Sequence, residues 1–409
     1  MPKTNSTIVR AFVCLLFMGF MVKAPPLWGE RFFYKHKTGD KYRILSTVNE
    51  EVYVNRRLSH RAEILNRIAV EITGIQNEIA RHEARFETAE RARGVRGGQS
   101  FQWEREYESE FDRDPRGYIT IDSKFFMPVV RNVPVFPGKD LERGDTWSAE
   151  GHEMHDFRDS FGITEPYRIP FTAQYTFLGR RQWKGRDYPA FSVSYRIFIE
   201  SESVRGAEAP LRRIMGASDQ IVYWDTALGQ AAAYEEIFRM VFELSGGGTV
   251  EYRGNAEAEL IESPEMDKEA VAREIGDAIN RMGITDTSVR VVEEGIAISL
   301  ENIQFQPDSA DLLPMERAKL DQIAGILQQY GDRDILIGGH TALAGSAADR
   351  MALSRERAAA VADYLLEKKI RAPDRIVVRG YGAERPLGDN NTEGGRRRNR
   401  RVEITILEN

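Results

Sequence analysis

Cysteine is almost absent from this chain. The only cysteine among 409 residues is Cys14, which lies inside an apolar run over residues 11–22. A lipoprotein cysteine would stand at the end of such a run, so lipidation of Cys14 is the less favoured alternative. If the run is removed with a signal peptide, the mature chain has no thiol. Disulfides, thiolate metal sites and cysteine nucleophiles are then excluded.

Long hydrophobic runs are missing as well. Residues 11–22 form the one unbroken apolar stretch, and a helix that spans a bilayer needs about 20 apolar residues. Lys3 and Arg10 precede the stretch, which is the arrangement of a secretory signal peptide. We therefore expect a signal peptide over residues 1–29 and no membrane span in the mature chain. An uncleaved anchor is the alternative.

An excess of positive charge is also lacking. The 57 basic and 63 acidic side chains give a net charge of −6, so no basic field attracts nucleic acid, and we expect no nucleic-acid partner. A hydrophobic content of 42% with 29% charged residues excludes both global disorder and a polytopic membrane protein. Because 409 residues exceed what one core usually organises, the sequence predicts two domains.

Recognisable catalytic motifs are absent too. There is no Gly-x-Ser-x-Gly elbow, and Gly246-Gly247-Gly248 is not followed by the Gly-Lys-Ser/Thr of a phosphate loop. Residues 152–156 (HEMHD) hint at a metal, but their His-x-x-His spacing differs from the His-Glu-x-x-His of zinc-binding helices. We expect a solvated loop there. The sequence predicts no enzyme, no cofactor and no metal site.

Residues 30–263 have the pattern of a β-rich N-terminal domain of unknown function. Aromatic and β-branched residues alternate with polar ones, and hairpin signals occur at residues 49–51, 179–189 and 246–248. Residues 61–93 fit either one helix face or two strands, and Gly74 favours strands with a turn at that glycine.

Proline and charge refine this expectation. Prolines in residues 127–137 and 165–170 exclude central strands there, so both segments are predicted as loops or edge crossings. The many charges of residues 104–116 would be costly against lipid. We therefore expect a mainly-β antiparallel curved sheet or partial barrel in the periplasm.

The strand pattern stops near Ser263, where a helical linker over residues 264–288 is expected. Asp267 can cap its helix and Gly283 can end it. A hairpin over residues 289–300 then leads into the last domain, residues 289–409. Its pattern is a helix over 314–330, a strand over 335–341, a helix over 349–369, a strand over 375–380 and a last strand over 399–404.

Short motifs occur in this last domain in a fixed order. They are Phe305 with Ser309-Ala310, Gly339-His340-Thr341, Leu353-Ser354 with Arg357-Ala358, Gly380-Tyr381-Gly382, Pro386, and Asn399-Arg400-Arg401-Val402. With this order the domain resembles the OmpA C-terminal domain family, which includes the peptidoglycan-associated lipoproteins and the stator B protein of the flagellar motor. The resemblance implies an α+β, OmpA-like βαβαββ sandwich. It also implies association with peptidoglycan at the outer membrane, in the periplasm or elsewhere in the cell envelope.

The resemblance further implies a site for the peptidoglycan stem peptide. Its arginine is Arg357, which would hold a carboxylate bidentately. The family's aspartate, which would pair with the stem-peptide amine, follows Gly-His-Thr, and Ala342 stands there, since 357 − 342 = 15 is the family's usual separation. Arg350 stands where the family usually has asparagine, and it shares a helix face with Arg357. Asp308 is the candidate replacement for the missing carboxylate.

The remaining motif residues leave two alternatives open. Thr341, Asn399 and Arg401 either line the ligand site or only shape the fold, with Asn399 as a cap and Arg401 tying the last strand to the helix. The sequence accordingly predicts a non-enzymatic envelope protein that binds the stem peptide, weakly because of Ala342. The alternative is a scaffold whose partners are other envelope proteins and whose OmpA-like domain no longer binds peptidoglycan.

Overall fold

The structure is a computed structural model that describes residues 29–93, 101–200, 211–261, 266–301, 303 and 312–408. The expected signal peptide lies outside these residues except for Gly29. The candidate ligand Asp308 and the expected domain boundary at residues 262–265 also lie outside them. No helix among the described residues is long and apolar enough to cross a membrane.

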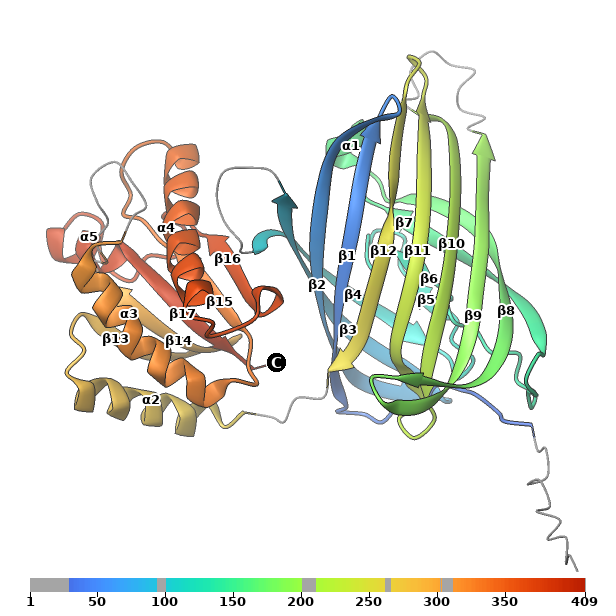
Figure 1. Ribbon diagram of the computed structural model, residues 1–409, viewed down its shortest axis with the longest axis horizontal. Coiled ribbons are helices and arrows are strands. Elements are labelled where there is room, and N and C mark those ends of the chain that lie inside the picture. Colours follow the sequence, from blue (N-terminus) through green and yellow to red (C-terminus); the bar gives the residue numbers. More distant parts are fainter. Residues whose placement is uncertain are drawn as a thin grey trace, which may run out of the picture.

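A large, open, curved antiparallel sheet dominates the N-terminal part (Figure 1). Its neighbours follow the order β4-β3-β2-β1-β12-β11-β10-β9-β8-β7, with short β5 beside β4 and short β6 beside β7. The strands are β1 (Lys41–Val54), β2 (Arg57–Gln76), β3 (Ile79–Arg93), β4 (Phe101–Arg113), β5 (Ile119–Ile121), β6 (Val130–Arg131), β7 (Thr146–His155), β8 (Tyr167–Trp183), β9 (Arg186–Glu200), β10 (Leu211–Asp225), β11 (Gln230–Leu244) and β12 (Thr249–Ile261), and the one-turn helix α1 is Arg158–Phe161. The mainly-β curved sheet expected from the sequence is confirmed.

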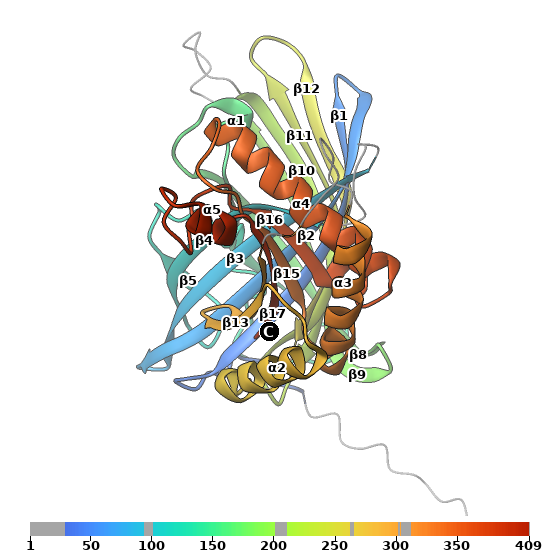
Figure 2. The ribbon, with the colours of Figure 1, turned by 90° about the vertical axis from the view of Figure 1, so that its left-hand side faces the viewer.

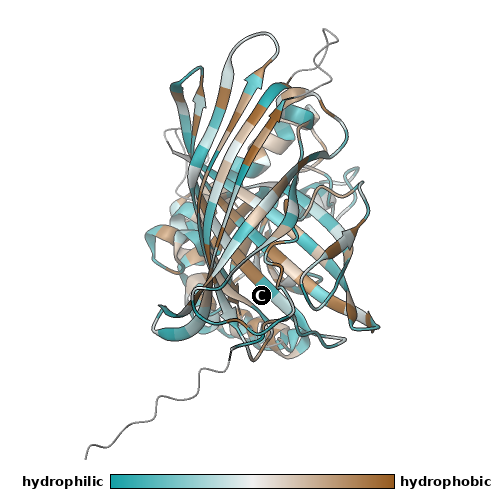
Figure 3. Cartoon of the chain, turned by 90° about the vertical axis from the view of Figure 1, so that its right-hand side faces the viewer, coloured by the Kyte–Doolittle hydropathy of each residue, from teal (hydrophilic) through white to brown (hydrophobic). Residues whose placement is uncertain are grey.

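The concave side of this sheet holds the N-terminal core. Apolar and polar residues alternate along the strands, as Figure 3 shows, and the apolar face of β8 and β9 buries Phe171, Tyr175 and Tyr195. The chain before β1 contributes Phe32, which packs edge-to-face on Phe191 with ring centroids 4.8 Å apart. The first described residues therefore anchor to the core rather than trail from it.

Two turns lie at other positions than the sequence pattern indicated. The expected turn at residues 49–51 is wrong, because β1 runs unbroken to Val54 and turns at Asn55 and Arg56. The strand assignment for residues 61–93 is confirmed, but the turn is at Asn77 and Glu78, both with positive φ, and not at Gly74. Gly74 instead marks an irregularity in the β2–β3 register. Paired positive-φ residues are the geometry of a tight hairpin, and asparagine, the first residue of each pair, tolerates it.

One predicted loop is a strand, and one of the two segments predicted as loops or edge crossings contains a strand paired on one side only. Residues 152–155 are the end of β7, where Glu153 and Met154 are buried, so the expected solvated loop is wrong. Pro170 lies inside β8, opposite His152 of β7, at a point where β8 does not yet pair with β9. A proline fits there because its missing N–H faces no partner strand. Residues 127–137 contain only the two-residue strand β6, as the prolines indicated.

The C-terminal part begins with helix α2 (Lys268–Met282), capped by the Asp267 carboxylate and ended by left-handed Gly283, as predicted. The hairpin β13 (Thr287–Val292) and β14 (Gly295–Glu301) follows. The rest consists of α3 (Pro314–Leu327), η2 (Gln328–Tyr330), β15 (Ile335–Gly339), α4 (Ala347–Glu367), η3 (Pro373–Arg375), β16 (Ile376–Gly380), α5 (Glu393–Asn399) and β17 (Arg401–Leu407). The short helix α5 was not foreseen. The sheet order is β13-β14-β17-β15-β16, in which only β15 and β16 pair in parallel.

The two faces of this second sheet have different neighbours. Ile335 and Ile337 of β15 face the core formed with the helices, whereas Leu336 between them faces the N-terminal sheet. Figure 2 shows α2, α3 and α4 on the side away from the N-terminal strands. The apolar contact between the sheets comprises Leu65, Ala89, Phe101, Leu336, Val377 and Leu407, with Leu45 and Trp103 packed against it.

Polar contacts surround this apolar contact. Arg67 of β2 pairs with Asp334 at 3.0 Å, and both side chains are nearly buried. At the edge, Val377 of β16 lies in parallel register with Phe101 of β4, so the two sheets also meet strand to strand. The N-terminal sheet therefore covers one face and one edge of the C-terminal sheet.

Candidate functional site

The candidate site lies where β15 and β16 end and helix α4 begins. Gly339 and Gly380 are the last residues of these strands, and both pack closely against Ser354 of α4. A Cβ added at Gly339 would lie 1.9 Å from the Ser354 carbonyl oxygen, and one added at Gly380 would lie 2.8 Å from the Ser354 Oγ. The Ser354 hydroxyl accepts a hydrogen bond from the Gly382 N–H at 2.9 Å. These motif residues therefore bring the strand ends against the helix.

The loop after β15 carries Thr341 and Ala342. The Thr341 N–H donates to the Gly382 carbonyl at 2.7 Å, which ties this loop to the loop after β16. The side chains of Thr341 and Ala342 are buried, and the Thr341 hydroxyl makes no hydrogen bond within the described part of the chain. A buried hydroxyl normally makes a hydrogen bond, so the Thr341 hydroxyl is a candidate contact for a ligand.

Both arginines of the candidate site lie on α4, as expected. Arg350 donates a hydrogen bond to the carbonyl of Gly345, in the loop that precedes the helix. Arg357, two turns further along the helix, is half-buried. Burial and the nearby charge of Arg400 lower the pKa of Arg357. Both effects disfavour the isolated cation, so an anion placed beside Arg357 would be stabilised.

Asn399 and Arg401 have structural partners. The Asn399 side chain accepts from the N–H groups of Leu387 and Gly388, both at 2.8 Å, and donates to the Gly388 carbonyl at 2.9 Å. Arg401 donates to Glu403 at 2.7 Å and to the Arg385 carbonyl at 3.0 Å. Asn399 thus shapes the loop after β16, and Arg401 ties the last strand to that loop and, through the Asn399 carbonyl at 3.5 Å, to the end of α5.

Asn390 joins the two loops, and no sequence motif indicated this residue. Its side-chain oxygen accepts from the Leu343 N–H at 3.0 Å and from the Asn399 amide at 2.9 Å. The residue after Ala342 is therefore held by the loop that Asn399 shapes.

His340 lies at the base of the site. Its ring stacks on Tyr381, with ring centroids 4.9 Å apart, and its Nε2 is 3.6 Å from a Glu403 oxygen. Burial lowers the pKa of His340. Burial alone raises the pKa of Glu403, but His340 and Arg401 outweigh it and hold that pKa well below its usual range. Glu403 is therefore an ionised carboxylate already engaged by neighbouring side chains.

Comparison with known proteins identifies this part of the chain. Residues 304–400 match the OmpA family. They form an OmpA-family domain. The resemblance recognised in the sequence motifs is confirmed for these residues.

Two curated relatives match the chain over about a hundred residues each. The peptidoglycan-binding protein ArfA of Mycobacterium bovis is 38% identical over 104 residues, which cover 25% of this chain and 32% of that protein. Outer membrane protein A of Bordetella avium is 42% identical over 103 residues, 25% of this chain and 53% of that protein. The chain thus spans about a third to a half of these curated relatives. A solved structure of an outer membrane protein of Borrelia burgdorferi B31 is 36% identical and covers 30% of this chain and 96% of that chain, with a TM-score of 0.25.

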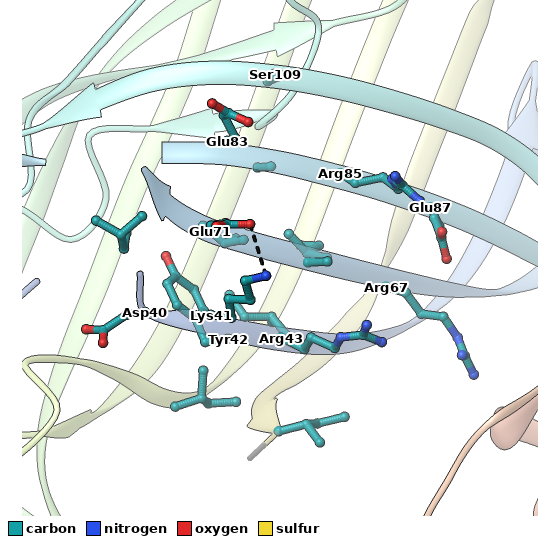
Figure 4. Close-up of a pocket in the computed structure, with 18 of the residues that line it drawn as sticks. Asp40, Lys41, Tyr42, Arg43, Arg67, Glu71, Glu83, Arg85, Glu87 and Ser109 are labelled. Atoms are coloured by element: carbon teal, nitrogen blue, oxygen red, sulfur yellow. Dashed lines mark ion pairs between the residues drawn. The ribbon is translucent and has the colours of Figure 1, made fainter. Parts of the chain in front are cut away.

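A hollow of about 1520 Å³ lies elsewhere, along β1 to β4 beside the OmpA-family domain. Figure 4 shows its lining, where charges of both signs alternate and Lys41 pairs with Glu71 at 3.4 Å. Arg85 reaches Glu293 of the β13–β14 turn at 2.6 Å. These ion pairs join the walls of the groove to one another.

Two members of the histidine cluster of β7, Glu153 and His155, have partners within the protein. Glu153 accepts from the Tyr195 hydroxyl at 2.7 Å and contacts His155 at 2.6 Å. His152 lies on the opposite face of the strand, since side chains alternate. Among the described residues no group of histidine, cysteine and acidic side chains could hold a metal ion.

Proposed function

We propose that this protein is a non-enzymatic, exported envelope protein whose OmpA-family domain binds the peptidoglycan stem peptide weakly. The observation that carries the proposal is the loop of Thr341, whose buried hydroxyl lacks a partner, next to a helix that presents Arg350 and Arg357. The match to the OmpA family and the name of its mycobacterial relative support this ligand class. In this proposal residues 30–263 and 289–409 are separate domains, the second a βαβαββ sandwich.

The chemistry of the ligand fits the charges of the site. A stem peptide offers a carboxylate and an amine on one residue, and a guanidinium can hold the carboxylate through two parallel hydrogen bonds. Burial and the nearby charge of Arg400 lower the pKa of Arg357, and a ligand carboxylate beside the guanidinium would favour its charged form. No carboxylate stands at position 342 to receive the amine. The ligand is therefore held at one end, which makes binding weak.

Sedimentation with purified peptidoglycan sacculi tests this function on the mature full-length protein. The native protein should co-sediment at high protein concentration, and Arg357→Ala should abolish this. Arg355→Ala is the matched control, because Arg355 is an exposed arginine on the same helix. Equal loss in both variants would show attraction by general positive charge rather than a stem-peptide site.

A scaffold without peptidoglycan binding is the second candidate, and two features favour it. The buried methyl group of Ala342 replaces an anion, and Arg350 bonds the loop carbonyl of Gly345. If the native protein and the Arg357 variant both stay in the supernatant, the domain is a scaffold and its partners are other envelope proteins.

Export is part of the proposal. The basic start and the apolar run over residues 11–22 support a cleaved signal peptide. Amino-terminal sequencing of the protein from its native envelope should give a start between residues 24 and 30. An intact Met1 on a membrane-anchored chain would contradict it.

A further inference from the structure

One arginine of the OmpA-family domain lies between an aromatic ring of each part of the chain. The guanidinium of Arg379, at the end of β16, lies over the Trp103 ring of β4 at 4.3 Å and over the Tyr381 ring at 4.9 Å. Glu106 of β4 holds the same guanidinium through an ion pair of 3.3 Å. A cation between two aromatic faces is attracted to both rings. The N-terminal sheet thereby fixes the position of Arg379.

Tyr381 contacts both Arg379 and His340 and so connects Arg379 to the candidate site. Its ring stacks on His340 with an interplanar angle of 11°, and Arg385 covers it at 4.3 Å. The ring also fills the space that a side chain at Gly338 would need, since a Cβ there would lie 2.8 Å from the Tyr381 ring. Tyr381 is buried, so its ring cannot move without displacing His340.

Backbone hydrogen bonds extend the connection to the loop after β15 that carries Thr341 and Ala342, here called the ligand loop. The Tyr381 N–H donates to the Gly339 carbonyl at 2.9 Å, and the Thr341 N–H donates to the Gly382 carbonyl at 2.7 Å. Tyr381 and Gly382 are thus bonded to the two residues that flank His340. A shift of Tyr381 moves Thr341 and the adjoining Ala342.

We propose that Trp103 and Arg379 are positioning residues of the ligand loop. Through Arg379 and Tyr381, the N-terminal sheet holds Thr341 in its binding conformation, although Trp103 itself touches no ligand. This inference rests on the proposed peptidoglycan binding for its functional consequence. The coupling itself can be measured without any ligand.

Nuclear magnetic resonance of the mature full-length protein tests the coupling directly. Trp103→Ala and Arg379→Gln should both shift the Thr341 amide and His340 imidazole signals, whereas Trp103→Phe should restore them by keeping a ring under the guanidinium. Leu45→Ala is the matched control. Leu45 and Trp103 pack against the same apolar contact, but Leu45 is outside the stack. Equal shifts in Leu45→Ala and Trp103→Ala would reduce Trp103 to a general interface residue and overturn the proposal.

Stem-peptide calorimetry on the same proteins tests the consequence. Loss of one cation–π contact should weaken affinity by about two- to fivefold in Trp103→Ala and Arg379→Gln. Trp103→Phe and Leu45→Ala should bind like the native protein. If Trp103→Ala unfolds, Arg379→Gln still tests the coupling, because this variant keeps the apolar contact between the sheets. If Arg379→Gln changes neither the Thr341 and His340 signals nor the affinity, the proposed coupling is wrong. If the signals shift but no protein binds the stem peptide, the native one included, only the proposed function is refuted.

Discussion

Replacing Ala342 by aspartate and Arg350 by asparagine should convert a weak peptidoglycan site into a strong one. The first change supplies the carboxylate that would receive the stem-peptide amine. The second removes a competing cation, because Arg350 already reaches the Gly345 carbonyl of the same loop and would capture a new carboxylate. We therefore expect the tightest binding for the double variant Ala342→Asp with Arg350→Asn, weaker binding for Ala342→Asp alone, and the weakest for the native protein.

The magnitude follows from the missing contact and from burial. A hydrogen bond to a charged group contributes about 1.5 to 3 kcal/mol, or about ten- to a hundredfold in affinity. The side chain at position 342 is only 6% exposed, so an aspartate there loses part of its hydration in the ligand-free protein. The double variant should therefore be less stable than the native protein without ligand and gain more stability than the native protein when ligand is added.

Isothermal calorimetry with a diaminopimelate stem peptide measures the affinity, and thermal unfolding with and without the peptide measures the stability. Adding Arg357→Ala to the double variant should abolish binding. If the native and double-variant proteins bind equally and both depend on Arg357, position 342 does not receive the amine. If neither protein binds, the pocket is closed and the scaffold alternative holds.

Three further predictions concern stability. A fragment of residues 267–409 should unfold in one cooperative transition, measured by circular dichroism. Its unfolding should need less denaturant than that of the full chain, because the apolar face toward the N-terminal sheet is no longer covered. A fragment that is unfolded without denaturant would show that the two parts share a single core. Burial lowers the pKa of His82 to about 3, so below pH 6.5 the unfolded chain holds a proton that the folded protein lacks. Stability should fall toward pH 4 by about 1.4 kcal/mol per pH unit for this group, and urea titrations of His82→Phe should lack that contribution. Burial and then repulsion from Glu90 raise the pKa of Glu50 to about 7, so its contribution to stability falls as pH rises from 4.5 to 7. Glu50→Gln should stabilise the protein by about 1 to 3 kcal/mol at pH 8 and hardly at pH 5 in the same titrations. An equal effect at both pH values would contradict this.

The elements were predictable where one residue type determines the local geometry. Asp267 and Gly283 delimit α2 because a carboxylate can accept an end N–H and glycine can adopt the left-handed conformation. The hairpin turn at Asn77 and Glu78 was missed, because glutamate is not a usual residue for positive φ and Gly74 nearby gave the stronger signal. Here the pairing of the long strands β2 and β3 overrides the local preference.

The packing of the two sheets was beyond sequence analysis. Leu336 alternates with Ile335 and Ile337 in an unbroken apolar strand, which indicates burial on both faces but not what covers each face. The same holds for Trp103, which reads as one more aromatic residue on a charged strand. Its partner Arg379 is more than 270 residues away, and no local pattern relates the two.

The structure also separates the motif residues that make the domain recognisable from those that decide what it binds. Gly339, Gly380 and Ser354 are fixed by the close approach of strand to helix, and Asn399 by the loop it shapes, so these residues persist whether or not a ligand is held. These contacts account for the fold of the domain and do not by themselves indicate a ligand. Ala342 lies on the loop after β15, and Arg350 and Arg357 lie on α4. In the proposed function the stem peptide depends on the side chains at these three positions, which is why substitutions there discriminate between a binding module and a scaffold.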